Sequence, residues 1–227
     1  MLHLTPDLRR RWALRKAPPG PMRDFLETPF PKLSADYREI EILAIDLETT
    51  GLDPRRDDIL SVGYVTMKGN RIDLGSARHR LVRTARAIPE ASAIIHQITD
   101  DQAAQGGLLD DVLAELLKDL SGKVMLAHHA TVEKGFLSDA CQRVYKVGLP
   151  VPIIDTQALA QRTFQRRHIA FKASDMRLHA LSERYNLPRY GAHNALSDAL
   201  AAAELFLAQA SHSDSSDKVP LRDFLTW

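Results

Sequence analysis

The sequence has little cysteine, no long apolar run and almost no net charge. Cys141 is the only cysteine among 227 residues, so no disulfide can form within the chain, and a reduced intracellular compartment fits best. No apolar stretch is long enough to span a membrane, and Arg9, Arg10 and Arg11 fall where the apolar core of a signal peptide would lie. We therefore expect a cytoplasmic protein with no membrane partner.

The formal net charge of +1 excludes neither nucleic acid nor any other partner, because local patches matter more than the sum. Hydrophobic content of 44% and charged content of 26% are ordinary for a soluble globular protein. The sequence has no internal repeat and no cluster of Cys and His residues, and the second absence argues against a zinc site. The length suits one sizeable domain with extensions.

Composition divides the chain into three parts. Residues 1–39 hold a basic stretch followed by several prolines. We expect a short basic helix over residues 4–16 and an extended proline segment, together an arm packed on or tethered to the main domain. Residues 40–212 form that domain. Residues 213–227 form a polar linker and a tail with apolar anchors.

The main domain alternates between strand and helix patterns, which predicts an α/β fold. Three β-rich runs separated by short turns predict an antiparallel meander over residues 41–47, 59–67 and 71–82. Two short buried strands follow over residues 124–127 and 151–154. Helical periodicity and capping residues predict helices over residues 108–120, 131–147, from about 155, 174–186 and 195–212. The result is a mixed five-stranded sheet flanked by helices.

Carboxylates stand at three separate points of this pattern. Asp46 and Glu48 are two apart on one strand, so they project on the same side, and a divalent cation would relieve their repulsion. Asp198 lies where a helix should begin, five residues after His193, and Glu133 lies on an earlier helix. Each alone can be an ordinary surface acid, Asp198 by favouring the helix dipole. Together, with a histidine suited to act as a general base, they indicate a two-metal nuclease site.

Four segments of the main domain stand out as motifs. They are residues 46–52 (Asp-Leu-Glu-Thr-Thr-Gly-Leu), residues 95–99, residues 128–137 and residues 193–199. In this order they resemble the motifs of the DnaQ-like DEDDh 3′–5′ exonucleases, the family that includes the proofreading epsilon subunit of bacterial DNA polymerase III. The resemblance covers roughly residues 40–210. It implies a ribonuclease H-like fold, with histidine 193 in the position of the general base.

The second motif departs from the family pattern, which normally reads His-Asn-Ala-x-Phe-Asp. Here His129 replaces the Asn, Val132 the Phe, and Glu133 the metal-site Asp. The alignment is secured by Phe136 and Leu137, which match the family's Phe-Leu. The carboxylate is therefore retained with one more methylene, and we expect it to bind metal directly or through water.

The resemblance implies a mechanism with two Mg²⁺ or Mn²⁺ ions about 3.5–4 Å apart on the scissile phosphate. Asp46 would bridge them, Glu48 and Asp198 would hold the ion that carries the attacking water, and Glu133 would position the other. His193 would take the proton from that water.

The implied substrate is a single-stranded 3′ end, DNA more than RNA, from which nucleoside monophosphates are released. The substrate-binding residues implied by the resemblance are Thr50, Gly51, Leu52, His96, Ile98 and His128. Leu52 and Ile98 could instead be core residues. A basic stretch between residues 162 and 172 is either a track for phosphates or only a solvated face.

Two other functions are compatible with the same motifs. One is an enzyme that trims RNA 3′ ends, of the RNase T or oligoribonuclease type, because the motifs do not separate sugar types. The other is a non-catalytic nucleic-acid-binding module on this fold, which only the altered second motif supports. A DNA polymerase or a repair complex is a candidate partner, although the tail contains no convincing clamp-binding peptide.

Overall fold

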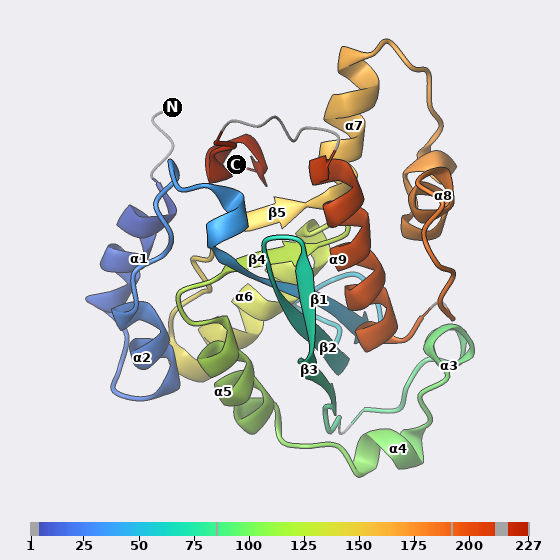
Figure 1. Cartoon of the computed structure of the whole chain (residues 1–227). Coiled ribbons are helices and arrows are strands. Elements are labelled where there is room, and N and C mark those ends of the chain that lie inside the picture. Colours follow the sequence, from blue (N-terminus) through green and yellow to red (C-terminus); the bar gives the residue numbers. More distant parts are fainter. Residues whose placement is uncertain (1–4, 85, 192, 212–217, 227) are drawn as a thin grey trace.

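The centre of the molecule is a mixed six-stranded sheet with the order β3-β2-β1-β4-β5-β6 (Figure 1). This computed structural model describes residues 5–84, 86–191, 193–211 and 218–226. The strands are β1 (Glu41–Thr49), β2 (Ile59–Lys68), β3 (Arg71–Leu81), β4 (Val124–Ala127), β5 (Ile153–Asp155) and β6 (Leu225–Thr226).

Helices flank the sheet and come from every part of the described chain. The α-helices are α1 (Pro6–Leu14), α2 (Pro21–Glu27), α3 (Glu90–His96), α4 (Asp100–Ala104), α5 (Leu109–Leu120), α6 (Thr131–Tyr145), α7 (Thr156–Arg166), α8 (Leu178–Arg184) and α9 (Ala195–Ser211). Short 3-10 helices are η1 (Tyr37–Glu39), η2 (Ala173–Met176) and η3 (Leu221–Asp223). No helix in the described residues is both long enough and apolar enough to cross a bilayer.

The strand pairing confirms the predicted meander and corrects the predicted strand count. Strands β1, β2 and β3 pair antiparallel, while β4 pairs parallel with β1, and β5 pairs parallel with β4. The prediction of five strands was wrong because β6, from the tail, pairs antiparallel with β5. A strand of two residues is too short to show the alternation on which strand prediction depends.

Alternation along β1 decides which face of the sheet carries the acids. Leu43, Ile45 and Leu47 pack on one face into the larger core, with side chains from α2, α5 and α6. Ile42 and Ala44 pack on the other face, against α9. Because side chains alternate along a strand, Asp46 and Glu48 continue the second set and project toward α9.

The N-terminal arm is a pair of helices that contributes to the main core. The predicted basic helix is α1, which Thr5 caps by accepting the Leu8 N–H. The expectation of an extended proline segment was wrong for residues 21–27, because Pro21 occupies the first position of α2, where a missing N–H costs nothing. Phe25 and Leu26 of α2 are buried in the larger core.

The C-terminal tail closes over the second face of the sheet. Phe224 packs against Tyr37 and Phe206, with ring centroids 4.8 and 5.4 Å apart. The Tyr37 N–H donates to the Val219 carbonyl, which joins the arm to the tail. The predicted polar linker falls largely on residues 212–217, outside the described part of the chain.

Three elements differ from the helical predictions. The helix expected over residues 174–186 is divided into η2 and α8, and α3 and α4 were not predicted. Both missed helices are short, with seven and five residues. Neither is long enough to display a clear helical period.

Candidate active site

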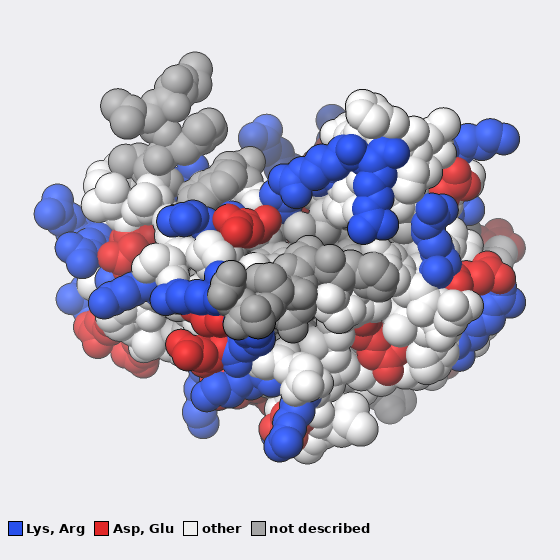
Figure 2. Space-filling model, turned by 45° about the horizontal axis from the view of Figure 1, so that its top comes forward, with Lys and Arg blue, Asp and Glu red and all other residues white. Residues whose placement is uncertain are grey.

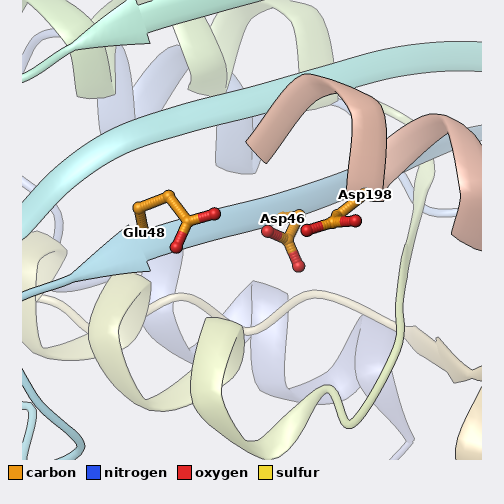
Figure 3. A group of neighbouring side chains, drawn as sticks. All are labelled: Asp46, Glu48 and Asp198. Carbon is orange, nitrogen blue, oxygen red and sulfur yellow. The ribbon is translucent and has the colours of Figure 1, made fainter. Parts of the chain in front are cut away.

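Three carboxylates predicted from two separate motifs lie together on the α9 face of the sheet. Oxygen atoms of Asp46, Glu48 and Asp198 all lie within 4.8 Å of one another. Figure 3 shows Asp46 and Glu48 on β1 facing Asp198 on α9. A set of oxygen ligands of this kind suits Mg²⁺ or Mn²⁺ better than a softer metal.

A glycine on the neighbouring strand lets α9 approach this closely. Gly63 of β2 is the pairing partner of Asp46. A Cβ atom on Gly63 would lie 2.1 Å from the Leu196 backbone nitrogen and 2.2 Å from the Ala195 carbonyl carbon. No L-residue other than glycine fits there without moving the start of α9, so Gly63 sets the distance between Asp198 and Asp46.

The loop before α9 fixes the orientation of Asp198. The Asp198 Oδ2 atom accepts the backbone N–H of His193 at 2.9 Å, and Asn194 Oδ1 accepts the Ser197 N–H at 3.1 Å. His193 has a φ of 65°, in the left-handed region. The His193 side chain is exposed and close enough to Asp198 to lower the pKa of that carboxyl in part. The loop thus brings an accessible imidazole beside the acids.

Glu133 lies near the three carboxylates but outside their group. Its side chain is 3% exposed, and its Oε2 atom has no hydrogen-bond partner among the described residues. A buried carboxylate oxygen without a donor is costly, and a cation would satisfy it. The second motif therefore contributes a carboxylate whose environment fits a metal site, although Glu133 is not one of the three grouped ligands.

Burial and mutual repulsion raise the pKa of all four acids. Burial, followed by the charges of Glu133, Asp198 and Glu48, raises the pKa of Asp46 well above its usual range. Burial and Asp198 raise the pKa of Glu48 to about 7. Burial, then Asp155 and Glu48, raises the pKa of Glu133 to about 8, against an opposing backbone hydrogen bond. Burial also raises the pKa of Asp198. Such a set of acids favours a bound cation.

The turn after β1 is held rigidly beside these acids. The Thr50 hydroxyl accepts the Asp58 N–H at 2.9 Å, and Ser92 of α3 donates to the Thr50 carbonyl at 2.8 Å. A Cβ on Gly51 would lie 2.4 Å from the Asp57 carboxylate. Leu52 on this turn is 83% exposed, so it is not a core residue.

The remaining predicted substrate contacts differ in how accessible they are. The buried His96 ring accepts the Ile98 N–H at its Nδ1 atom, and its Nε2 atom has no partner in the described chain. Ile98 packs with Leu60 and Ile88 in a small hydrophobic cluster. The two ring nitrogens of His128 contact the Thr156 hydroxyl and the Met176 carbonyl, and burial lowers its pKa to about 4. His128 therefore has no free ring nitrogen for a substrate.

Sequence reasoning missed three residues around the site. Asp155 accepts the N–H groups of His129 and Ala130, which ties the start of α6 to the end of β5. Ile94 on α3 is 70% exposed, two residues beyond the Ser92 contact with the turn. Gly63 is the third. The position of Asp155 at the end of a strand was a usable signal, whereas the roles of Gly63 and Ile94 depend on contacts between distant segments.

These features define an α/β protein with a carboxylate site suited to a divalent cation. The chain belongs to the exonuclease family, because the family model described as Exonuclease, of the RNase T type, matches residues 43–206. Its similarity to epsilon subunits places it among the DnaQ-like members of that family.

Two relatives show how much of the chain is shared. The DNA polymerase III subunit epsilon of Treponema pallidum is 30% identical over 180 residues, which are 78% of this chain and 80% of that protein. The PolC-type DNA polymerase III of Thermotoga maritima is 30% identical over 171 residues, which are 75% of this chain. The chain matches only 12% of the length of that polymerase.

A solved structure supports the fold assignment. Exonuclease X, in complex with 5′ overhanging duplex DNA, has a TM-score of 0.60 at 23% identity. The match covers 81% of this chain and 98% of that one. The ribonuclease H-like α/β fold implied by the motifs is therefore correct, with six strands in place of five.

Proposed function

We propose that the protein is a metal-dependent 3′–5′ exonuclease that releases nucleoside monophosphates from single-stranded 3′ ends, DNA in preference to RNA. The observation that carries this proposal is the meeting of Asp46, Glu48 and Asp198 within 4.8 Å, on a member of the exonuclease family. The preference for DNA is supported by relatives named as DNA polymerase III subunits.

Asp46, Glu48 and Asp198 would hold the metal, with Glu133 as the fourth carboxylate. The fit is supported by the raised pKa values of these acids and by the unpartnered Oε2 atom of Glu133. We propose two Mg²⁺ or Mn²⁺ ions, which when bound would lower the pKa of a water and stabilise negative charge on the phosphate.

His193 is the proposed general base. Its exposed imidazole lies next to Asp198, where the neutral ring can take a proton from the attacking water. The water oxygen bonds to phosphorus as the bond from phosphorus to the 3′ oxygen breaks. The products are a nucleoside 5′-monophosphate and a strand shortened by one nucleotide with a new 3′ hydroxyl.

The turn after β1 and helix α3 would bind the terminal nucleotide. Thr50, Gly51 and Leu52 lie on a turn that Ser92 of α3 holds through the Thr50 carbonyl. Leu52 and Ile94 offer two exposed apolar side chains for contact with a base or sugar. The unpartnered Nε2 atom of His96 is buried, so it would contact a nucleotide only if the surface above it opened. Within this proposal the protein works in the cytoplasm, and a DNA polymerase or a repair complex is its candidate partner.

One assay tests this function against the alternatives. Labelled single-stranded DNA and RNA of one sequence are incubated with the protein and Mg²⁺, Mn²⁺ or EDTA, with the label at the 5′ end. We expect a ladder that shortens from the 3′ end, faster for DNA, and no cleavage in EDTA. Faster cleavage of RNA would indicate an RNA-trimming enzyme. Binding without cleavage of either strand in any metal would indicate a non-catalytic module.

A further inference from the structure

Charge is unevenly distributed along the chain, although its total is close to zero. Residues 156–190 hold seven Lys and Arg residues against two Asp and Glu residues, a net charge of +5, whereas the whole chain has +1. The rest of the protein is therefore net negative. This segment comprises α7, η2 and α8, and it is the strongly basic part of the main domain.

The basic segment begins beside the candidate active site, and a later part of it lies close to the site again. Its first helix, α7, follows Asp155, whose charge contributes to the raised pKa of Glu133. At its return, the Met176 carbonyl at the end of η2 contacts the His128 ring at 2.9 Å. His179 of α8 is close enough to Asp198 to lower the pKa of that carboxyl in part. The start of the segment and its stretch around Met176 and His179 therefore lie close to the site.

Three of the seven cations are engaged within the protein. Arg162 donates to the Phe224 carbonyl, Arg184 lies 4.5 Å from the centre of the Phe164 ring, and Arg189 pairs with Glu183. These contacts hold the segment together and anchor it to the tail. Three of the segment's positive charges therefore have interaction partners within the protein.

The other four cations have no such partners in the described chain. Arg166, Arg167, Lys172 and Arg177 are exposed, and none of them forms an ion pair with an acid in the described chain. Figure 2 shows Lys and Arg side chains gathered over the part of the surface around α7. Arg177 immediately follows Met176, near the site, whereas Arg166 and Arg167 are at the far end of α7. At about 1.5 Å per residue, α7 carries them roughly 16 Å away.

A polyanionic substrate needs such a surface here. Every phosphate of a strand carries a negative charge, and the candidate site itself consists of acids. The rest of the main domain, residues 40–155 and 191–212, holds 13 Lys and Arg residues against 19 Asp and Glu residues, so within this domain the segment is the part that attracts the outgoing strand. A row of cations that starts beside the acids and extends outward fits the phosphates of a single strand.

We propose that Arg166, Arg167, Lys172 and Arg177 form a track for the phosphates of the substrate strand that lie 5′ of the bond to be cleaved. This inference rests on the proposed exonuclease function and adds where the uncleaved part of the strand is held. The four residues are called the phosphate track below.

The test is a fourfold variant, Arg166→Gln, Arg167→Gln, Lys172→Gln and Arg177→Gln. Its matched control removes the same charge from exposed cations on the β2–β3 hairpin, α5 and the end of α6: Lys68→Gln, Arg71→Gln, Lys118→Gln and Lys146→Gln. Circular dichroism and melting temperature show whether both variants fold. If the fourfold variant does not fold, the pair Arg166→Gln and Arg167→Gln replaces it.

Binding is measured in EDTA, where no cleavage occurs, with a fluorescent single-stranded oligonucleotide of about twenty nucleotides at several salt concentrations. Each lost contact to a single-strand phosphate should reduce the slope of log K against log salt by about 0.7, so the track variant should lose up to about 3. We expect its affinity at low salt to fall at least about tenfold, and the control to keep the wild-type slope. Equal losses in both variants, or none in the track variant, would overturn the proposal.

Turnover separates the track from the chemistry. A dinucleoside monophosphate has no phosphate 5′ of the bond to be cleaved, so on this substrate the variant should match the wild type. On the longer oligonucleotide its KM should rise with little change in kcat. If the wild type cleaved neither substrate, the proposed function would fail, whereas the binding experiment in EDTA would still decide whether the track exists.

Discussion

The two sides of the candidate site are built in different ways. On the α9 side, Asp46, Glu48 and Asp198 are grouped within 4.8 Å by a backbone contact at Gly63 and a backbone hydrogen bond from His193. On the α6 side, a single longer side chain, Glu133, is buried near the group, and its Oε2 atom has no hydrogen-bond partner among the described residues. On the α9 side, the backbone therefore fixes the positions of the carboxylates. On the α6 side, the length of the Glu133 side chain determines how far its carboxylate extends.

The largest effect should come from the grouped acids. Asp46→Asn and Asp198→Asn each remove a ligand charge but keep the side-chain shape, so turnover should fall by at least about 10³ while the melting temperature changes little. Rates on a labelled oligonucleotide with Mg²⁺ measure this. Near-normal turnover in either variant would remove the metal-ligand assignment of that acid.

Replacement of His193 should have a smaller but still large effect. His193→Ala should lower turnover by roughly 10²–10⁴, the usual range for loss of a general base. Metal binding should persist, because the proposed ligand Asp198 accepts the backbone N–H of His193 rather than a side-chain group. Turnover in His193→Ala within a few-fold of the wild-type value, on the labelled oligonucleotide with Mg²⁺, would exclude His193 as the base.

The backbone contact itself can be broken with one methyl group. Gly63→Ala forces the start of α9 away from β2, and a displacement near 1 Å can cost about 10²-fold in turnover. Its matched control is Gly191→Ala, since a Cβ on Gly191 has nothing within 4 Å. The rise in melting temperature on adding Mn²⁺ should shrink in Gly63→Ala and persist in the control. An unaltered Mn²⁺ response would show that α9 tolerates the methyl group.

Variants of Glu133 test the α6 side of the site. Glu133→Ala should lower activity by roughly 10–100-fold and raise the metal concentration required, whereas Glu133→Asp should retain part of the activity. Wild-type rates and wild-type Mg²⁺ dependence in the alanine variant would leave a site of three acids. Measured together, the two variants show whether carboxylate charge or reach matters.

The smallest effect is a pH dependence of stability in the metal-free protein. The folded pKa values of Glu48 and Glu133, about 7 and about 8, exceed the ordinary value near 4.3 of an unfolded Glu. The stability that they contribute is therefore fully present below about pH 4.3 and is lost as the pH rises from there to the folded values. Between about pH 5 and 8 in EDTA the melting temperature should fall, less so in Glu48→Gln/Glu133→Gln. A flat curve for the wild type would contradict the raised pKa values.

The sequence predicted features that depend on neighbouring residues, and it did not predict features that depend on contacts between residues far apart in the chain. Alternation along β1 was enough to put Asp46 and Glu48 on one side. Helical periodicity was enough to find α5, and alanine-rich composition was enough to find α9. The contact of Gly63 with α9 joins residues more than a hundred positions apart, and no local pattern reports it. The N-terminal arm is a second example. Its sequence predicts an extension outside the domain, whereas in the structure Phe25 is buried in the larger core with side chains of α5.

The pairing of β6 with β5 has a consequence for how the protein is made. Thr226 donates to the carbonyl of Ile153, across a separation of 73 residues. While the ribosome is adding those residues, the outer edge of β5 has no partner strand, and the ring of Tyr37 lacks its contact with Phe224. An open strand edge can pair with another nascent chain. Folding of this sheet therefore ends with the arrival of the tail, and slow translation of the intervening helices would prolong the exposure of that edge.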